Sequence, residues 1–127
     1  MNNEDYASYE LAKKLKACGF DEPCRDFYWT SDGTFKHTDA LVHKNSLGCD
    51  TMVAAPLLYH AQKWLREKKG IFVEVTSEAL YDWDFFVLEL DEDVNAGLAR
   101  GSEIYPSYEQ ALSAGIASAL ELIKKGE

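Results

Sequence analysis

The sequence predicts an α+β fold in which an antiparallel sheet of two hairpins packs against three amphipathic helices, in the order α-ββ-α-ββ-α. Apolar residues recur at helical spacing in three segments, near residues 9–18, 56–69 and 107–125. Between the last two segments the apolar period changes from 3.6 to 2, as expected for strands. The 127 residues, 46% of them hydrophobic, are enough for one core, so we expect a single domain over residues 1–127.

Each predicted helix has recognisable ends. The first places four apolar residues on one face, and Gly19 is expected to end it in a left-handed conformation: Leu11, Ala12, Leu15 and Cys18. The second is expected to begin at Pro56 and to end at Gly70, after cations that suit the negative end of the helix dipole. Ser107 and Gln110 have capping-box spacing at the start of the third.

The strand predictions rest on alternation and on turn residues. Residues 71–76 alternate in polarity and residues 81–90 follow after a polar bridge, which predicts an antiparallel pair. The second run is apolar on both faces toward its end, which is typical of an inner strand. Residues 27–30 have strand composition and the turn Ser31-Asp32-Gly33 follows, so residues 34–42 are expected to return as a second strand. Residues 43–55 and 91–103 are predicted to be loops.

Charge and cysteine content limit the classes of function. The 13 Lys and Arg residues against 22 Asp and Glu residues give a net charge of −9, which repels phosphate backbones and anionic lipids. We therefore expect no direct nucleic-acid binding and no membrane binding. No apolar run is long enough for a membrane helix and the start is acidic, so a cytoplasmic location is expected. The three cysteines, Cys18, Cys24 and Cys49, are expected to be free thiols.

Two segments have some features of a metal site. Asp91, Asp93 and Asn95 stand at the first, third and fifth positions of a calcium loop, but Gly97 comes one place late and Ser102 occupies the twelfth position. A solvated acidic turn, with Glu103 downstream, is the preferred interpretation. A zinc site can be considered among the cysteines and His37, His43 and His60, but no closely spaced cysteine pair exists. We therefore predict no metal and no cofactor.

No catalytic motif is present. Cys24 or Cys49 with a histidine provides the residue types for nucleophilic catalysis, but the sequence has no nucleophile elbow, phosphate loop or His-Glu-x-x-His helix. Asp82 and Asp84 flank Trp83 and have the spacing of a carboxylate pair, although solvent-facing strand residues are the simpler explanation. We predict no catalytic residues.

The aromatic residues of the predicted strands are the most distinctive candidate surface. Tyr81, Trp83 and Phe85 share one strand face, and residues 27–29 are expected on a neighbouring strand. Core packing beneath the helices is the preferred interpretation. The alternative is an interaction patch with acidic residues at its rim, formed by Tyr81, Asp82, Trp83 and Asp84.

Three sequence segments carry a family resemblance: residues 9–16, residues 55–67 and residues 107–112. With these, the chain resembles a family of small uncharacterised proteins from Bacteroides-type gut bacteria and their phages or mobile elements. The resemblance covers the three helices and the strand pair between the last two. It implies no catalytic residues, because the shared motifs are helix caps, an amphipathic tryptophan helix and an aspartate-tryptophan strand.

Three classes of function remain. The preferred one is a small acidic protein-binding or accessory module. The second is a phage or mobile-element inhibitor of host defence or a regulatory inhibitor that mimics the charge of nucleic acid, which requires the acidic residues to lie in a stripe. The third, least favoured, is an enzyme with a non-standard site. A homodimer is compatible with the sequence, and the protein partner is not indicated by it.

Overall fold

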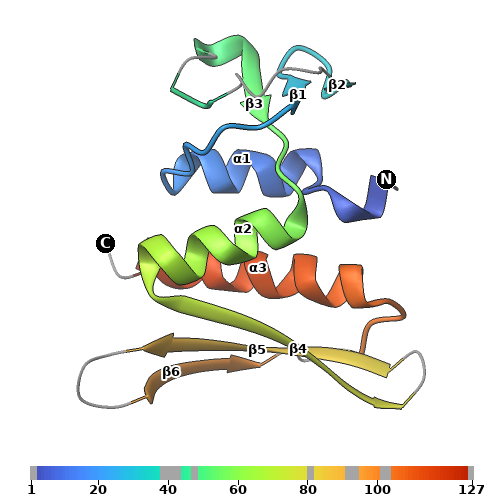
Figure 1. The fold of residues 1–127 in the computed structure, drawn as a ribbon, viewed down its shortest axis with the longest axis vertical. Coiled ribbons are helices and arrows are strands. Elements are labelled where there is room, and N and C mark those ends of the chain that lie inside the picture. Colours follow the sequence, from blue (N-terminus) through green and yellow to red (C-terminus); the bar gives the residue numbers. More distant parts are fainter. Residues whose placement is uncertain are drawn as a thin grey trace. The chain divides into compact units, whose positions relative to one another are not determined.

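The structure is a computed structural model that describes residues 3–37, 44–46, 49–79, 82–90, 95–100 and 104–125. The chain groups into an N-terminal unit, Met1–Leu57, and a C-terminal unit, Leu58–Glu127. Each unit contains a three-stranded antiparallel sheet (Figure 1). The predicted α+β class and the approximate order of elements are confirmed. The strands divide between two sheets, however, and a single domain stays a prediction.

The described residues of the N-terminal unit form one α-helix and three short strands. Its elements are η1 (Asn3–Asp5), α1 (Tyr9–Ala17), β1 (Asp26–Trp29), β2 (Phe35–His37), η2 (Cys49–Thr51) and β3 (Met52–Ala54). β1 lies between β2 and β3, so the predicted hairpin around Gly33 is present. Of the second strand predicted over residues 34–42, the structure shows residues 35–37, and residues 38–42 lie outside the described residues. The prediction of a loop over residues 43–55 is wrong for β3. That strand has only three residues, too few to show an alternating pattern in the sequence. It forms through hydrogen bonding to the edge of β1.

Helix α1 begins and ends where the sequence predicts. The Ser8 hydroxyl oxygen accepts a hydrogen bond from the Leu11 backbone N–H at 3.2 Å, which caps the first turn. Gly19 has a φ of 95°, the left-handed conformation expected after a helix. The apolar face of α1 is buried, and it includes Leu11, Ala12 and Leu15.

A buried asparagine joins two segments of the N-terminal unit that are distant in sequence. The Asn45 side-chain amide donates to the Phe20 carbonyl at 2.7 Å, and its carbonyl oxygen accepts from the Ala54 N–H at 2.9 Å. Asn45 thus satisfies one backbone acceptor after α1 and one backbone donor in β3. Because unsatisfied buried polar groups are costly, this side chain fixes the path of a segment that has little regular structure.

The C-terminal unit places its helices on one face of its sheet (Figure 1). Its elements are α2 (Leu58–Trp64), the π-helix η3 (Leu65–Lys69), β4 (Ile71–Ala79), β5 (Asp82–Leu90), β6 (Asn95–Arg100) and α3 (Tyr108–Lys125). The second helix begins two residues later than expected, at Leu58, and Gly70 ends its π-helical continuation with a φ of 67°. The Ser107 hydroxyl oxygen accepts from the Gln110 N–H at 3.1 Å, which confirms the predicted cap of α3.

The strand order of this sheet is β4-β5-β6. β5 is therefore an inner strand, as its apolar C-terminal half predicts. The expectation of a loop over residues 91–103 is wrong for β6, which pairs with the second half of β5. The Asn-Ala-Gly composition of β6 gives it little intrinsic strand propensity, so this strand was not identifiable from local sequence alone.

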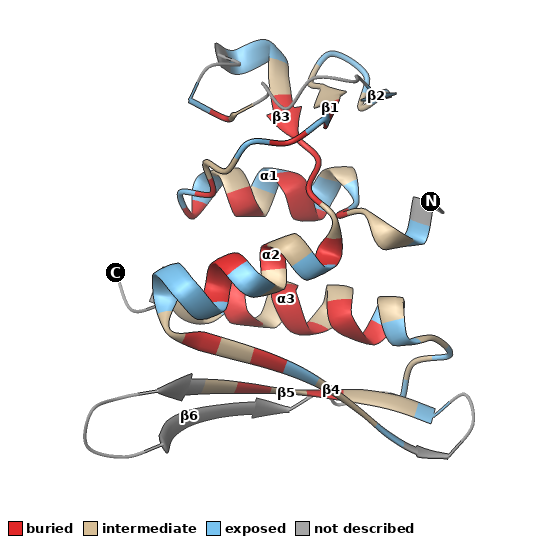
Figure 2. Cartoon of the chain, viewed as in Figure 1, coloured by how far each residue is buried: buried red, intermediate tan, exposed pale blue. Residues whose placement is uncertain are grey.

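Helix α3 packs closely on the sheet because it carries a glycine at the contact. A Cβ atom built on Gly115 would lie 2.6 Å from Val73 Cγ1 and 3.1 Å from Phe85 Cγ. The residues around this contact form the core of the unit, shown in red on α3, β4 and β5 in Figure 2. They include Ile71, Val87, Ala111, Leu112, Ile116, Ala119 and Leu120.

A side chain of α2 forms a hydrogen bond with the backbone of β4. The Gln62 amide nitrogen donates a hydrogen bond to the Val73 carbonyl oxygen at 2.7 Å. β4 pairs with β5 on one side only, so this carbonyl belongs to the outer edge of the sheet. Gln62 therefore provides a hydrogen-bond donor for one backbone carbonyl of this edge that has no partner strand.

Candidate functional site

The predicted interaction patch is divided between the two faces of β5. Tyr81 lies outside the described residues, Asp82 is exposed, and Trp83 and Asp84 are half-buried. Successive residues of a strand point to opposite faces, so Trp83 lies on the helix-covered face whereas Asp82 and Asp84 lie on the other face. The structure therefore does not place the tryptophan and its two flanking carboxylates on one common face.

Trp83 packs within the C-terminal unit. Its backbone exchanges two hydrogen bonds with Tyr105, at 3.0 and 2.8 Å, and its ring meets Tyr108 edge-on with centroids 5.6 Å apart. Next to these contacts, Ile104 is 66% exposed and Tyr108 is 41% exposed. The contacts of Trp83 agree with the core interpretation.

The N-terminal aromatic residues belong to a different sheet. Phe27, Tyr28 and Trp29 belong to β1, in the other sheet, so the expectation that they lie on a strand neighbouring β5 is wrong. Within their own unit, the Tyr28 ring lies 5.5 Å from that of Tyr9 and 5.4 Å from that of Phe35. The strand composition of residues 27–29 was informative, but composition does not specify which strand is the neighbour.

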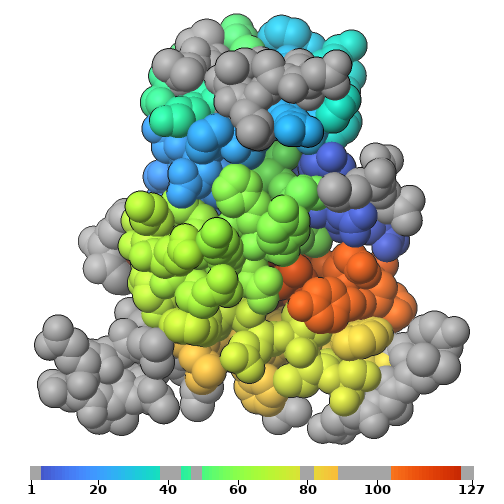
Figure 3. All heavy atoms as spheres, in the orientation of Figure 1, coloured from blue at the N-terminus to red at the C-terminus, as the bar shows by residue number. Residues whose placement is uncertain are grey.

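The sheet face opposite α3 is the candidate binding surface, and we call it the open face. Among the described residues of this unit, no helix lies on that side (Figure 1), and atoms of β4 and β5 reach the surface on the side away from α2 (Figure 3). The pairing register places Phe72 opposite Leu88, Glu74 opposite Phe86, and Thr76 opposite Asp84. Glu74 is exposed and the other five side chains are half-buried.

The segment that forms this sheet carries most of the net charge of the protein. Residues 71–103 contain nine Asp and Glu residues and one basic residue, Arg100, a net charge of −8 within a total of −9. On the open face, the exposed Glu74 lies directly across from Phe86, and Asp84 is the next residue of β5 on this face. The surface thus combines three large apolar side chains with carboxylates.

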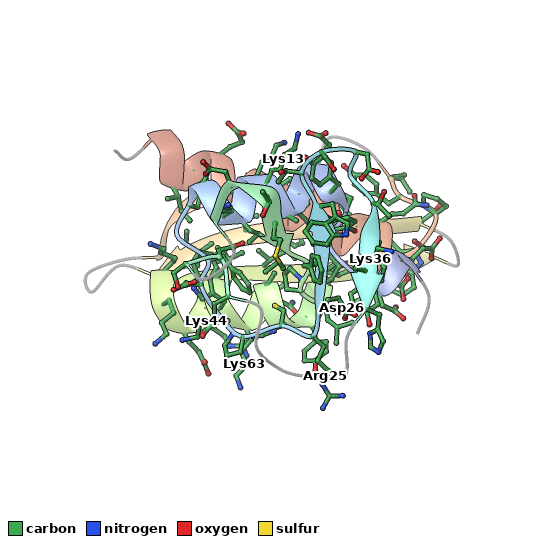
Figure 4. The ribbon with its side chains drawn as sticks, turned by 90° about the horizontal axis from the view of Figure 1, so that it is seen from above. Lys13, Arg25, Asp26, Lys36, Lys44 and Lys63 are labelled. Carbon is green, nitrogen blue, oxygen red and sulfur yellow. The ribbon has the colours of Figure 1, made fainter. Side chains whose placement is uncertain are left out.

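A second cluster surrounds a buried carboxylate in the N-terminal unit. Asp26 is only 5% exposed, and its carboxylate is paired with Nδ1 of His37 and accepts a hydrogen bond from the Tyr6 hydroxyl. Burial and the negative charge of Asp26 raise the pKa of Tyr6. In Figure 4 the side chain of Arg25 points away from the ribbon near Asp26, and Lys36 is on the neighbouring strand β2.

Sequence reasoning missed this cluster, because it considers His37 among possible zinc ligands and does not single out Asp26. His37 is in fact exposed, with 58% of its side-chain surface accessible, and its partner is the buried group. The hairpin register places Asp26 directly across from His37. The available signal was therefore a pair of ionisable residues on either side of the Ser31-Asp32-Gly33 turn.

Of the two candidate nucleophiles, Cys49 has a side chain outside the described residues, and Cys24 has the properties of a packing residue. Cys24 is buried, and desolvation together with the negative charges of Asp26 and Glu22 raises the pKa of its thiol from 9.0 to about 12. Because the thiolate is the reactive form, this thiol is unreactive at neutral pH. Its Sγ instead donates to the Glu22 carbonyl oxygen at 3.6 Å. Cys18 is also a buried free thiol.

The structure describes the two candidate metal-binding segments only in part. Asp91, Asp93 and the residues after Arg100 in the calcium-like segment lie outside the described residues, as does His43, while Asn95 and Gly97 belong to β6. Where the chain is described, no three His, Cys, Asp or Glu side chains are grouped so that they could hold a metal ion.

The helices in the same parts of the chain are all too short or too polar to cross a membrane.

Comparisons with known proteins do not assign the chain to a family. No protein-family model, no curated protein and no solved structure matches it.

Proposed function

We propose that the protein is a small acidic accessory module that binds another protein through the open face. The observation that carries this proposal is the partial exposure of Phe72, Phe86 and Leu88 on a sheet whose other face is covered by its own helices. A two-layer unit needs only one covered face for its core, so the core of this unit does not account for three large apolar residues on the second face. Apolar groups gathered on a surface typically mark an interaction site.

Catalysis at the Asp26 cluster is the alternative to binding, and it is less well supported. The Asp26 carboxylate can orient the His37 imidazole, as a buried carboxylate does in acid–base catalysis. Catalysis by such a pair also requires a nucleophile or a bound substrate within hydrogen-bond reach. Cys24, the thiol closest to it in sequence, is held in its protonated form by burial. Binding is therefore the better-supported function.

Site-specific photo-cross-linking tests the proposal. Glu74 is replaced by p-benzoylphenylalanine to report on the open face, and Glu67, an exposed residue of η3 in the same unit, is replaced as the matched control. In native host cells we expect a discrete cross-linked protein from position 74 that is absent from position 67. Identical cross-links from both positions, or none from position 74, would contradict binding through the open face.

A second candidate function is inhibition of a nucleic-acid-binding protein by charge mimicry. The concentration of a net charge of −8 in residues 71–103 favours it, as does the resemblance to proteins of phages and mobile elements. A mimic occupies the same cationic site as the nucleic acid. An excess of duplex DNA should therefore abolish the cross-link from position 74 if the protein is a mimic, and should leave it unchanged if the protein is an accessory module.

A further inference from the structure

The open face has an apolar end and an acidic end. Phe72 and Leu88 form one cross-strand pair, and Phe86 is the next residue of β5 on the same face. Glu74 and Thr76 continue the face along β4, opposite Phe86 and Asp84 respectively. The chemistry thus changes along the strands, from large apolar side chains at one end to carboxylates at the other.

The charge of this surface selects among the molecules that could cover it. A second copy of the chain would bring two segments of net charge −8 together, which is unfavourable at short range. Nucleic acids and anionic lipids are repelled for the same reason. A protein segment with lysine or arginine residues is attracted, and its apolar residues can cover the three large apolar side chains.

We propose that the open face binds a cationic amphipathic helix of a partner protein, with the apolar residues of the helix over Phe72, Phe86 and Leu88 and its basic residues over Glu74 and Asp84. This inference rests on the proposed function and names the class of partner. It is supported by the register of β4 with β5 and by the half-buried and exposed states of these side chains.

The dimensions of the face fit one helix. A three-stranded sheet spans about 10 Å between its outer strands, close to the diameter of a single helix. The pair formed by Phe72 and Leu88 lies four residues along the strands from the pair formed by Thr76 and Asp84, which is about 13 Å. At a rise of about 1.5 Å per residue this corresponds to roughly nine helical residues. The partner helix should therefore carry a basic residue over Asp84 two to three turns from its first apolar residue, and another over Glu74 about halfway between them.

Binding of synthetic peptides to the full-length protein tests this inference. The probe is a fluorescent helical peptide with three leucines on one face of its first two turns and three lysines on the same face of its last two turns. The first control has the same composition with the leucines spread around the helix, and the second has glutamates in place of the lysines. Fluorescence anisotropy should show saturable binding of the probe only, weakened several-fold between about 50 mM and 300 mM salt.

Two protein variants with the same change in charge locate the contact. Glu74→Lys reverses a carboxylate on the open face, and Glu67→Lys reverses an exposed carboxylate of η3. We expect Glu74→Lys to weaken binding of the probe about fivefold or more, since an attraction becomes a repulsion, and Glu67→Lys to change it less than about twofold. Phe86→Thr keeps a residue of high strand propensity and should also weaken binding. Because both glutamates are exposed, the charge variants should fold normally even if Phe86→Thr does not.

Each alternative outcome overturns the inference in a recognisable way. Equal weakening by Glu74→Lys and Glu67→Lys would show attraction by net charge alone. Equal binding of either control peptide would remove the requirement for a basic amphipathic helix. Concentration-dependent dimerisation that Glu74→Lys abolishes would identify a second copy as the occupant. A cross-link from position 74 to a partner segment without basic residues would overturn this inference and leave the proposed function intact. The absence of any specific cross-link from position 74 would refute the proposed function itself.

Discussion

Replacing Gly115 by alanine tests the close packing of α3 on the sheet. The added Cβ would lie 2.6 Å from Val73 Cγ1, nearer than carbon atoms approach one another, so the helix or the valine must move. Overpacking costs about 1–3 kcal/mol of stability, and the 2.6 Å approach places this substitution in the upper half of that range, at about 2–3 kcal/mol. Alanine is also the better helix former, which returns about 1 kcal/mol. We therefore expect a net loss of about 1–2 kcal/mol in the free energy of unfolding, the difference between those two terms.

Urea unfolding followed by circular dichroism measures this loss, with an unchanged slope showing that the unfolded state is the same. Ala117→Gly, at a half-buried position of the same helix, provides the control for helix propensity alone and should cost about 1 kcal/mol. Val73→Ala removes the nearest atom, so combining it with Gly115→Ala should recover part of the loss, as measured by a double-mutant cycle. A Gly115→Ala protein more stable than the parent by about 1 kcal/mol would refute the close approach, because only the propensity term would then be acting.

Three further changes test the N-terminal unit. Asn45→Ala should lower the free energy of unfolding by about 1–3 kcal/mol, since the Phe20 carbonyl and the Ala54 N–H lose their partner, and chemical denaturation would measure it. Asp26→Ala should cause a loss of similar size, about 1–3 kcal/mol, by removing the acceptor of Tyr6 and the partner of His37; a change no larger than that of an exposed carboxylate would show that the cluster is not stabilising. The raised pKa of Cys24 contributes stability that is fully present below pH 9 and is lost as the pH rises toward about 12. Alkaline unfolding should consequently be shallower in Cys24→Ala, and Cys24 should resist alkylation in the native protein near pH 7; rapid labelling there would contradict its burial.

The helices were predictable because the information that forms them is local. Caps such as Ser8 and Ser107 act on backbone groups within four residues, and Gly19 and Gly70 end their helices by their own conformations. The long alternating strands were predictable for the same reason. By contrast, β3 and β6 are strands because of partners elsewhere in the chain, and no window around either segment contains that information.

The candidate site was predictable only in its residues. The sequence singled out Asp82, Trp83 and Asp84, but their function depends on which face of β5 the helices cover. The helices cover the face of β5 that carries Trp83, so this tryptophan packs within the unit, whereas Phe86 and Leu88 lie on the accessible face. The Asp26–His37 pair depends likewise on the register of a hairpin, which composition alone does not specify.

The hydrogen bond from Gln62 to the Val73 carbonyl has a consequence for assembly. An outer strand with free backbone groups is a template on which other chains can add strands, the first step toward fibrils. At Val73 an incoming strand would have to displace an amide already held by a helix of the same unit. A protein with apolar side chains accessible on a sheet surface benefits from such a block, because partners can then approach across the sheet while further strands are discouraged from joining it at β4.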